Sequence, residues 1–187
     1  MKVVIISSTA NKKLAPFIEE QMNSLRSIGI TCVLFQVTQN GIIGYLKHYK
    51  LLKRMIRLEK PDLIHAHYGF SGLLANLQRK IPVITTFHGT DINNKKIRWI
   101  SFIVARLSEK SIYVTEQLKT LSRNDYGVVI PCGVDLSVFT PQEMTLAKRK
   151  MKLDSTKNYV LFCSKFDNSI KNSPLAIGAF NELKKRQ

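Results

Sequence analysis

The sequence has little of several things that would indicate other classes of protein. Its 187 residues include 3 cysteines, Cys32, Cys132 and Cys163, which are far apart and form no CxxC pair. This number and spacing argue against a disulfide framework or a structural metal site and indicate a reducing compartment. With 6 prolines, 9 glycines and 44% hydrophobic residues, the composition is that of a globular chain. No run approaches the ~20 apolar residues that cross a bilayer, and the apolar N-terminus is typical of a first strand rather than a signal peptide.

Acidic residues are also scarce. The chain has 13 Asp and Glu against 29 Lys and Arg, a formal net charge of +16. The excess is concentrated: residues 45–60 carry six basic side chains and one acid, and residues 95–110 carry five and one. Such a balance implies an anionic partner, either nucleic acid, anionic lipid or a phosphorylated substrate.

Short β-branched apolar runs alternate with longer stretches of helical period. This alternation predicts an α/β fold, a Rossmann-like doubly wound parallel sheet with right-handed crossovers. The runs have little polar alternation, as expected for strands covered on both faces. We expect strands at 2–7, 31–37, 62–66, 82–87, 111–114, 128–130 and 159–164, and helices at 14–28, 44–58, 69–79, 97–109, 116–124, 142–151 and 173–186.

Four of the predicted strands end in polar or glycine-bearing loops. Because the carboxyl ends of parallel strands meet along one edge, we expect these loops to form one ligand cleft. The strand at 82–87, for example, is apolar until the chain turns to His88-Gly89-Thr90-Asp91. The four loops are residues 7–9, 65–69, 88–91 and 132–135.

A second domain begins near the end of the chain. Residues 131–141, PCGVDLSVFTP, read as a connection, and residues 159–185 start a new strand–loop–helix unit. One strand and one helix do not bury a core of their own. We therefore predict a domain at 1–155 and, at 156–187, the first strand–helix unit of a truncated second domain.

Five stretches carry recognisable motifs: PDLIHAHYGFSGLLA (61–75), PVITTFHGTDI (82–92), SEKSIYVTEQLKTLS (108–122), VIPCGVDLSVFTP (129–141) and YVLFCSKFDNSIKNSPLAIGAFNELKK (159–185). These stretches resemble the retaining glycosyltransferases of family 4, which have the two-domain GT-B architecture. They occur in the order and spacing of that family and cover most of the chain from residue 61 on. The resemblance implies that 1–155 is the acceptor-side half of a GT-B enzyme and that 156–187 opens a nucleotide-sugar-binding domain.

The resemblance implies transfer of a sugar from a nucleotide sugar to a glycan or lipid-linked acceptor, with retained anomeric configuration and with no metal or other cofactor. The leaving diphosphate then needs cations or a helix N-terminus, and the positions that match the basic pair of the family are Lys165 and Lys171. A lysine in place of the usual first arginine lacks the planar two-pronged fork. The glutamate pair of the family has no counterpart up to Gln187, so we expect this chain alone to bind donor weakly and to be inactive.

His88 is the main candidate for the chemistry, because the resemblance places it against the donor sugar and a neutral imidazole hydrogen-bonds through either nitrogen. The alternative is a histidine that only ends a strand. Gly89 fits close approach of the donor to the backbone, or an ordinary turn. Asp91 reads more simply as a cap of the following turn.

The acceptor side of the cleft is predicted to include Ser8, Thr9, His67 and Tyr68. We expect His65 and His67 to point to opposite faces of their strand, with His65 in the core and His67 near the cleft. The histidines do not form a convincing metal site.

The basic helix at 44–58 has two interpretations. Tyr45, Leu52, Met55 and Ile56 share one face, with the basic residues outside it. The outer face is either only solvated or, like the patch at 95–106, docks on anionic lipid. We accordingly expect a cytoplasmic enzyme of surface polysaccharide or glycolipid synthesis, peripheral at the inner face of the membrane.

Two other functions remain open from the sequence. A basic non-catalytic module that binds nucleic acid or anionic membrane would explain the charge, but no nucleic-acid reader motif is present, so no specific nucleic acid is expected as a partner. The chain would instead be a natural non-catalytic partner protein if its gene ends at Gln187.

Overall fold

The computed structural model describes residues 1–8, 14–39, 41–164, 166–167 and 171–185. The chain divides into two compact units, Met1–Leu136 and Ser137–Gln187. The division falls inside the connection at 131–141. The boundary expected at 155/156 therefore lies within the second unit.

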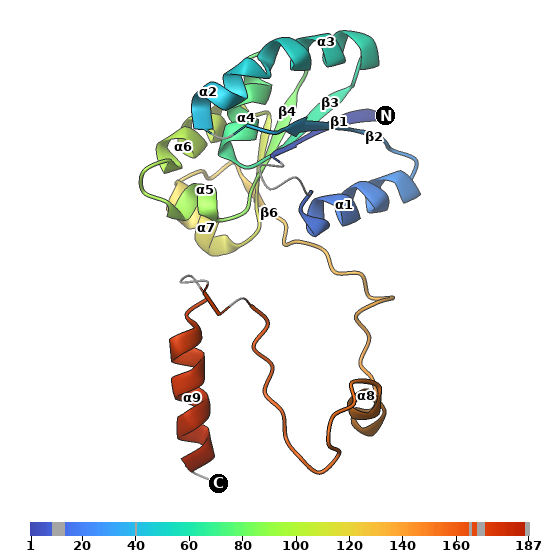
Figure 1. Ribbon diagram of the computed structural model, residues 1–187. Coiled ribbons are helices and arrows are strands. Elements are labelled where there is room, and N and C mark those ends of the chain that lie inside the picture. The colour runs from blue at the N-terminus through green and yellow to red at the C-terminus, as the bar shows by residue number, and fades with distance from the viewer. Residues whose placement is uncertain (9–13, 40, 165, 168–170, 186–187) are drawn as a thin grey trace. The chain divides into compact units, whose positions relative to one another are not determined.

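The first unit is built on a parallel sheet, which confirms the predicted α/β, Rossmann-like fold (Figure 1). In the described residues the sheet has six strands in the order β2-β1-β3-β4-β5-β6. The strands are β1 Lys2–Ser8, β2 Thr31–Val37, β3 Leu63–His67, β4 Val83–Phe87, β5 Lys110–Tyr113 and β6 Val128–Val129. Each lies within one or two residues of its predicted bounds, because β-branched apolar runs are the strongest strand signal.

The helices of the first unit are unequally shared between the two faces of the sheet. In the described residues α1 covers one face at β1 and β2, and the other helices pack on the opposite face. This follows from the strand order, because the β1–β2 connection runs in the direction opposite to the later right-handed crossovers. The helices are α1 Pro16–Ser27, α2 Gly41–Lys47, α3 Tyr49–Glu59, α4 Gly69–Asn76, α5 Thr90–Asn93, α6 Arg98–Leu107 and α7 Glu116–Ser122.

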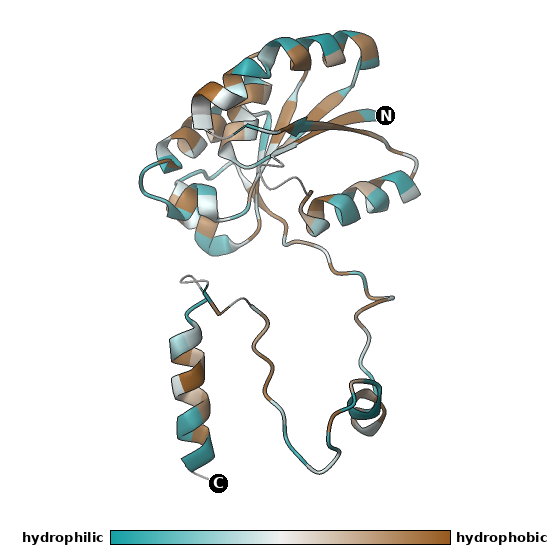
Figure 2. Ribbon diagram, in the orientation of Figure 1, coloured by the Kyte–Doolittle hydropathy of each residue, from teal (hydrophilic) through white to brown (hydrophobic). Residues whose placement is uncertain are grey.

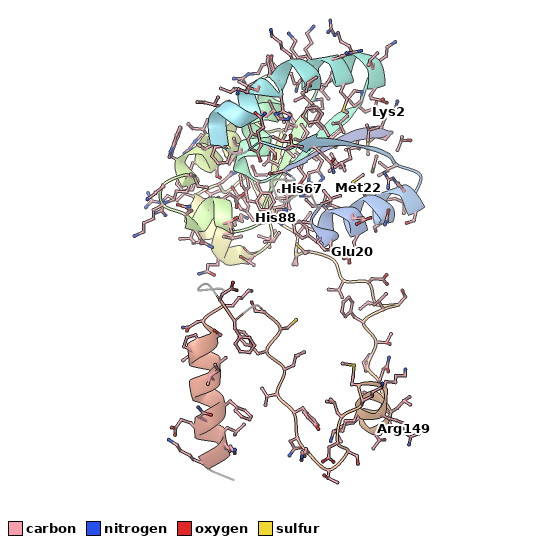
Figure 3. All side chains as sticks on the ribbon, in the orientation of Figure 1. Lys2, Glu20, Met22, His67, His88 and Arg149 are labelled. Carbon is pink, nitrogen blue, oxygen red and sulfur yellow. The ribbon has the colours of Figure 1, made fainter. Side chains whose placement is uncertain are left out.

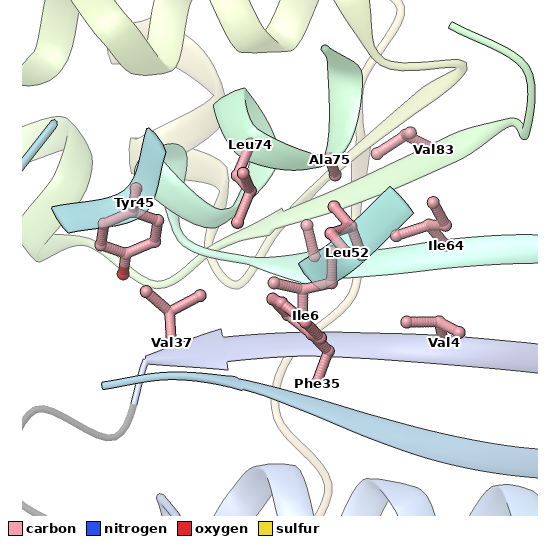
Figure 4. Packing of buried hydrophobic residues seen from close by; sticks show 11 residues of the cluster. Val4, Ile6, Phe35, Val37, Tyr45, Leu52, Ile64, Leu74, Ala75 and Val83 are labelled. Atoms are coloured by element: carbon pink, nitrogen blue, oxygen red, sulfur yellow. The ribbon is translucent and has the colours of Figure 1, made fainter. Parts of the chain in front are cut away.

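The larger part of the core lies under the many-helix face. One cluster joins β1–β4 to α2, α3 and α4 and includes Ile6, Leu52 and Leu74 (Figure 4). A second joins β4 and β5 to α6 and α7 around Phe87 and Tyr113. Figure 2 shows the apolar strands inside and the mixed surfaces of the helices outside. The predicted inner face of residues 44–58 is confirmed, since Leu52 is fully buried and Met55 and Ile56 pack on the same cluster.

The predicted helix at 44–58 is in fact two helices that meet at His48. The ring Nδ1 of His48 lies 2.8 Å from the carbonyl oxygen of Gly44, and its backbone N–H donates to Tyr45 instead of Gly44. The side chain thus takes the backbone acceptor that an uninterrupted helix would use.

The second unit contains α8 Met144–Lys150 and α9 Ser173–Lys185. The strand predicted at 159–164 is wrong: these residues have no strand pairing, and Val160 and Leu161 are exposed. A parallel strand forms only against a neighbour, and the described part of this unit offers none. In the described residues, no helix of either unit is long and apolar enough to cross a membrane.

Candidate active site

A row of histidines lies on the sheet face that carries α1. The β3–β4 register pairs His65 with Ile84 and His67 with Thr86, so these side chains share one face. Continuing β4 by two residues brings His88 to the same face, just beyond the end of the strand. Figure 3 shows His67 and His88 close together between the sheet and α1.

The expectation that His65 and His67 point to opposite faces is wrong. Residues two apart in a strand point to the same face, and the two rings stack with centroids 4.6 Å apart. Both rings are buried, and His65 Nε2 lies 2.7 Å from the Thr86 hydroxyl. His65 therefore lies on the same face of the sheet as His67 and packs against its ring, and it does not belong to the apolar core on the other face.

His67 and His88 are directly hydrogen-bonded. His67 Nδ1 lies 3.0 Å from His88 Nε2, so one ring donates and the other accepts. The Nε2 atom of His67 is buried and has no hydrogen-bond partner among the described residues. The opposite nitrogen of His88, Nδ1, lies 4.0 Å from the thiol of Cys132.

Aromatic rings hold the His88 ring on two further sides. The Phe17 ring of α1 lies 4.6 Å from it between centroids, and the Tyr68 ring lies 4.8 Å from it. Tyr68 has φ 71° and ψ 156°, a backbone region that is nearly restricted to glycine. A strained backbone of this kind persists only where the surrounding structure holds it. In this conformation the Tyr68 ring lies against His88.

The three histidines of the row are neutral at pH 7. Burial lowers the pKa of His65 and that of His88 to about 4, with the neighbouring His65 adding to the effect on His88. Burial, with His65 and His88 nearby, lowers the pKa of His67 to about 2. Neutral imidazoles offer one donor and one acceptor each, so the row presents polar but uncharged groups.

His67 and His88 open into a cleft of about 770 Å³ in the first unit. α1 forms one wall, the sheet forms the floor, and residues 130–136 form the other wall. This volume lies in the range of small-molecule sites. The lining residues are Phe17, Glu20, Gln21, Asn23, Ser24, Leu25, Ser27, His67, Thr86, His88, Ile112, Val114, Ile130, Pro131, Cys132, Gly133, Val134, Asp135 and Leu136.

Asp91 is buried behind the turn that follows His88. Its Oδ1 accepts a hydrogen bond of 2.9 Å from the backbone N–H of Gly89, which has φ 114°. Burial raises the pKa of Asp91, and backbone N–H groups, that of Gly89 first, oppose the rise. Asp91 thus fixes a turn in which glycine is favoured for its positive φ.

The predicted site residues fall into three groups. His67, His88 and Tyr68 come together, although the Tyr68 side chain is not among the described lining of the cleft. Gly89 forms the turn beside them, and Ser8 ends β1 outside that lining. Lys171 is exposed in the second unit, and Thr9 and Lys165 lie outside the described residues.

Sequence reasoning missed Phe17, Thr86 and Cys132. Thr86 carried a signal, because it lies two residues before His88 and so points to the same face of the strand. Cys132 lies in one of the loops expected at the cleft, but an isolated cysteine drew no attention. Phe17 comes from α1, and no local pattern links that helix to His88.

Comparison with known proteins connects the chain to a family. Residues 2–138 match the family model for Glycosyltransferase Family 4. A 109-residue segment is 34% identical to an uncharacterized glycosyltransferase of Methanocaldococcus jannaschii, covering 52% of this chain and 31% of that protein. A 110-residue segment is 28% identical to the UDP-Gal:α-D-GlcNAc-diphosphoundecaprenol α-1,3-galactosyltransferase of Escherichia coli, covering 50% of this chain and 27% of the enzyme.

The fold has a similar counterpart among solved structures. Sucrose-phosphate synthase from Thermosynechococcus elongatus superposes with a TM-score of 0.67 at 14% identity, over 82% of this chain and 53% of that one. The matched segments thus span less than a third of the length of the two curated relatives. The superposition covers about half of the sucrose-phosphate synthase chain.

Proposed function

The chain belongs to glycosyltransferase family 4, and we propose that its first unit is the acceptor-side half of an enzyme that transfers a sugar from a nucleotide sugar to a glycan or lipid-linked acceptor. The observation that carries the proposal is the His67–His88 pair opening into the 770 Å³ cleft. These residues lie at the carboxyl ends of β3 and β4, where doubly wound sheets bind their ligands.

His88 acts through its Nδ1 atom. Its Nε2 atom is engaged by His67. Its Nδ1 atom has only the Cys132 thiol at 4.0 Å, a weak contact that a ligand in the cleft would replace. Because the lowered pKa keeps the ring neutral, Nδ1 donates to or accepts from a sugar hydroxyl according to the tautomer that the His67 contact selects. The ring positions the reacting sugar, and the transfer retains the anomeric configuration.

The leaving diphosphate requires positive charge, which the neutral histidines do not supply. We assign this role to Lys165 and Lys171 of the second unit, with Gly89 offering close backbone approach to the donor. The role of Lys171 agrees with its exposure and with the absence of an ion pair to it among the described residues. No metal takes part in the proposed reaction.

The proposed acceptor is a glycan or a lipid-linked intermediate of surface polysaccharide or glycolipid synthesis, and the transferred group is a hexosyl unit. The named donor and acceptor of the Escherichia coli relative support this class. Ser8, Thr9, Tyr68 and His67 are the proposed acceptor-side residues.

The test replaces His88 with glutamine in the full-length natural protein and measures nucleotide release from a panel of UDP- and GDP-sugars. We expect a loss of about 100-fold in turnover, the scale of losing one well-placed polar group. His48→Gln is the matched control, because His48 lies at the junction of α2 and α3 and does not line the cleft. Equal turnover in all three proteins, each folded by circular dichroism, would remove His88 from the chemistry.

Peripheral contact with anionic lipid at the cytoplasmic face of the membrane belongs to the same proposal. Its support is the outer face of α3, where Leu51 and Leu58 are exposed among basic residues. An amphipathic helix of this composition binds anionic interfaces. The triple variant Lys50→Gln/Arg54→Gln/Arg57→Gln is expected to bind phosphatidylglycerol vesicles less than the parent chain in a sedimentation assay, and unchanged binding contradicts the contact.

A further inference from the structure

A second cavity of the first unit lies between α6 and α7 and has a volume of about 630 Å³. α6 contributes an arginine at each end and a phenylalanine between them, and the end of α7 contributes two hydroxyls, a leucine and a third arginine. The cavity is within the size range of small-molecule sites. Its lining residues are Arg98, Phe102, Arg106, Thr120, Leu121, Ser122 and Arg123.

The three arginines are not neutralised within the described part of the chain. No acidic residue lines the cavity, and the ion pairs found there involve none of the three. Guanidinium groups stay protonated at any physiological pH, so three positive charges meet around one hollow. Like charges gathered without a counter-charge are unfavourable unless an anion joins them.

The walls of the cavity are fixed by local hydrogen bonds. The hydroxyls of Thr120 and Ser122 donate to backbone carbonyls of α7, at 3.1 and 2.7 Å. Nη1 of Arg106 donates to the carbonyl of Phe102 at 3.2 Å, which leaves the other guanidinium donors of Arg106 available. Donors for a ligand therefore come from the arginines, and the hydroxyls stiffen the wall.

Arg123 has an unfavourable backbone conformation. It is the C-cap of α7 with φ 52° and ψ 40°, a left-handed conformation that glycine or asparagine usually fills. An arginine at this position places a charge at the cavity at some expense of stability.

From these observations we propose that the α6–α7 cavity binds a phosphate group. Guanidinium forks match phosphate oxygens with paired hydrogen bonds, which makes arginine the preferred residue for this ligand. Trp99, Ile103 and Leu121 are exposed next to the arginines, so an apolar group attached to the phosphate has surface to contact. A soluble phosphate ester and a phospholipid headgroup share this chemistry.

The cavity is separate from the proposed active site. α6 and α7 pack on the sheet face that holds Phe87 and Tyr113, whereas His67 and His88 lie on the opposite face. Failure of the phosphate site thus leaves the proposed transferase function untouched, and the reverse also holds.

The experiment titrates the 187-residue chain with two soluble probes by isothermal calorimetry. Inorganic pyrophosphate represents a free phosphate, and monomeric dihexanoyl phosphatidylglycerol represents a lipid headgroup. The triple variant Arg98→Gln/Arg106→Gln/Arg123→Gln is expected to bind the active probe at least about tenfold more weakly, as expected for loss of charge-assisted hydrogen bonds. The emission of Trp99, the single tryptophan of the chain, reports whether the probe binds near α6.

The matched control is Arg149→Gln/Lys150→Gln/Lys152→Gln, which removes the same charge from exposed positions of the second unit. It should keep the affinity of the parent chain. Arg123→Gly is a second variant: it relieves the left-handed strain, so it should fold with an unchanged or higher thermal midpoint and still bind more weakly.

The outcomes separate clearly. Binding of pyrophosphate alone identifies a soluble phosphate, and binding of the lipid probe alone identifies a headgroup. Either one, lost in the arginine variant and kept in the second-unit variant, supports the site. Binding of neither probe overturns the proposal. Equal weakening in both triple variants also overturns it, because that result indicates diffuse charge attraction.

Discussion

The two faces of β3 and β4 differ in what they bury. On one face Ile64, Ala66 and Phe87 pack under α4 and α6 as an apolar core. On the other face, residues next to them in sequence, His65, His67 and Thr86, are almost as deeply buried but polar. Adjacent residues of one strand thus have different roles, one in the apolar core and the next in the polar histidine face, because successive side chains point to opposite faces of the sheet.

The comparison shows one place where this domain gives up stability. A buried polar atom without a partner destabilises the fold, and His67 Nε2 is such an atom within the described residues. Around β3 and β4 the apolar face buries apolar side chains, while the histidine face holds groups useful to a ligand. Four predictions test this division, from the largest expected effect to the smallest.

Acid should destabilise the protein through the histidine face. The unfolded chain takes up protons below about pH 6.5, whereas burial lowers the pKa of His65 and His88 to about 4 in the folded state and that of His67 to about 2. Stability present above pH 6.5 is therefore lost as the pH falls, by up to about 1.4 kcal/mol per pH unit for each histidine. Urea unfolding at pH 7 and pH 5 measures the loss.

The variant His65→Gln/His67→Gln is the matching control for the acid experiment. Removing two of the titrating groups should make the stability of the first unit depend less steeply on pH. A parent protein with the same unfolding free energy at pH 7 and pH 5 would contradict the burial of neutral imidazoles.

Phe87→Ala tests the apolar face. Phe87 is fully buried and stacks on Tyr113 with centroids 5.2 Å apart. The truncation should lower the unfolding free energy by about 3–5 kcal/mol without changing its pH dependence between pH 7 and 5. Ile112→Ala, on the cleft side and half-buried, is the comparison and should cost clearly less in the same urea titration.

His67→Ala tests the link between the two proposed site histidines. Without the 3.0 Å contact, His88 loses the partner that fixes its ring and tautomer. Turnover in the full-length protein should therefore fall about tenfold, the scale of one hydrogen bond to a polar group. His67→Asn places an amide near the Nδ1 position and should restore part of the activity. If alanine and asparagine variants are equally slow, the contact does not position His88.

Lys60→Gly gives the smallest effect and concerns only the helices of the apolar face. Lys60 is the C-cap of α3 in a left-handed conformation, with φ 47°. Glycine has no Cβ penalty there, so the melting temperature should rise with a gain of about 1 kcal/mol. Lys60→Ala keeps the Cβ and should show no comparable gain in differential scanning calorimetry.

Much of the fold was readable from local patterns. The apolar runs at β1, β2 and β4 predicted their strands, and the inner face of α3 followed from its period. The failures concern context. Residues 159–164 have the composition of a strand but pair with none, and His48 divides a continuous helical pattern through one side-chain hydrogen bond.

The candidate site was predictable only in part. The loops after β3 and β4 identified His67 and His88, because the ends of parallel strands gather at one edge. Their direct hydrogen bond depends on the β3–β4 register, and the contact of Phe17 depends on how α1 packs. Neither relation has a signature in one sequence, since both join segments far apart in the chain.

The position of Cys132 has a practical consequence. Its exposed thiol lies at the wall of the cleft next to His88, whereas Cys32 is buried. In a Cys163→Ser background, alkylation at mildly alkaline pH should therefore add its mass at residue 132, and a sugar or nucleotide occupying the cleft should slow that labelling. Mass spectrometry of the labelled protein would show which ligands enter the cleft without the need for a turnover assay.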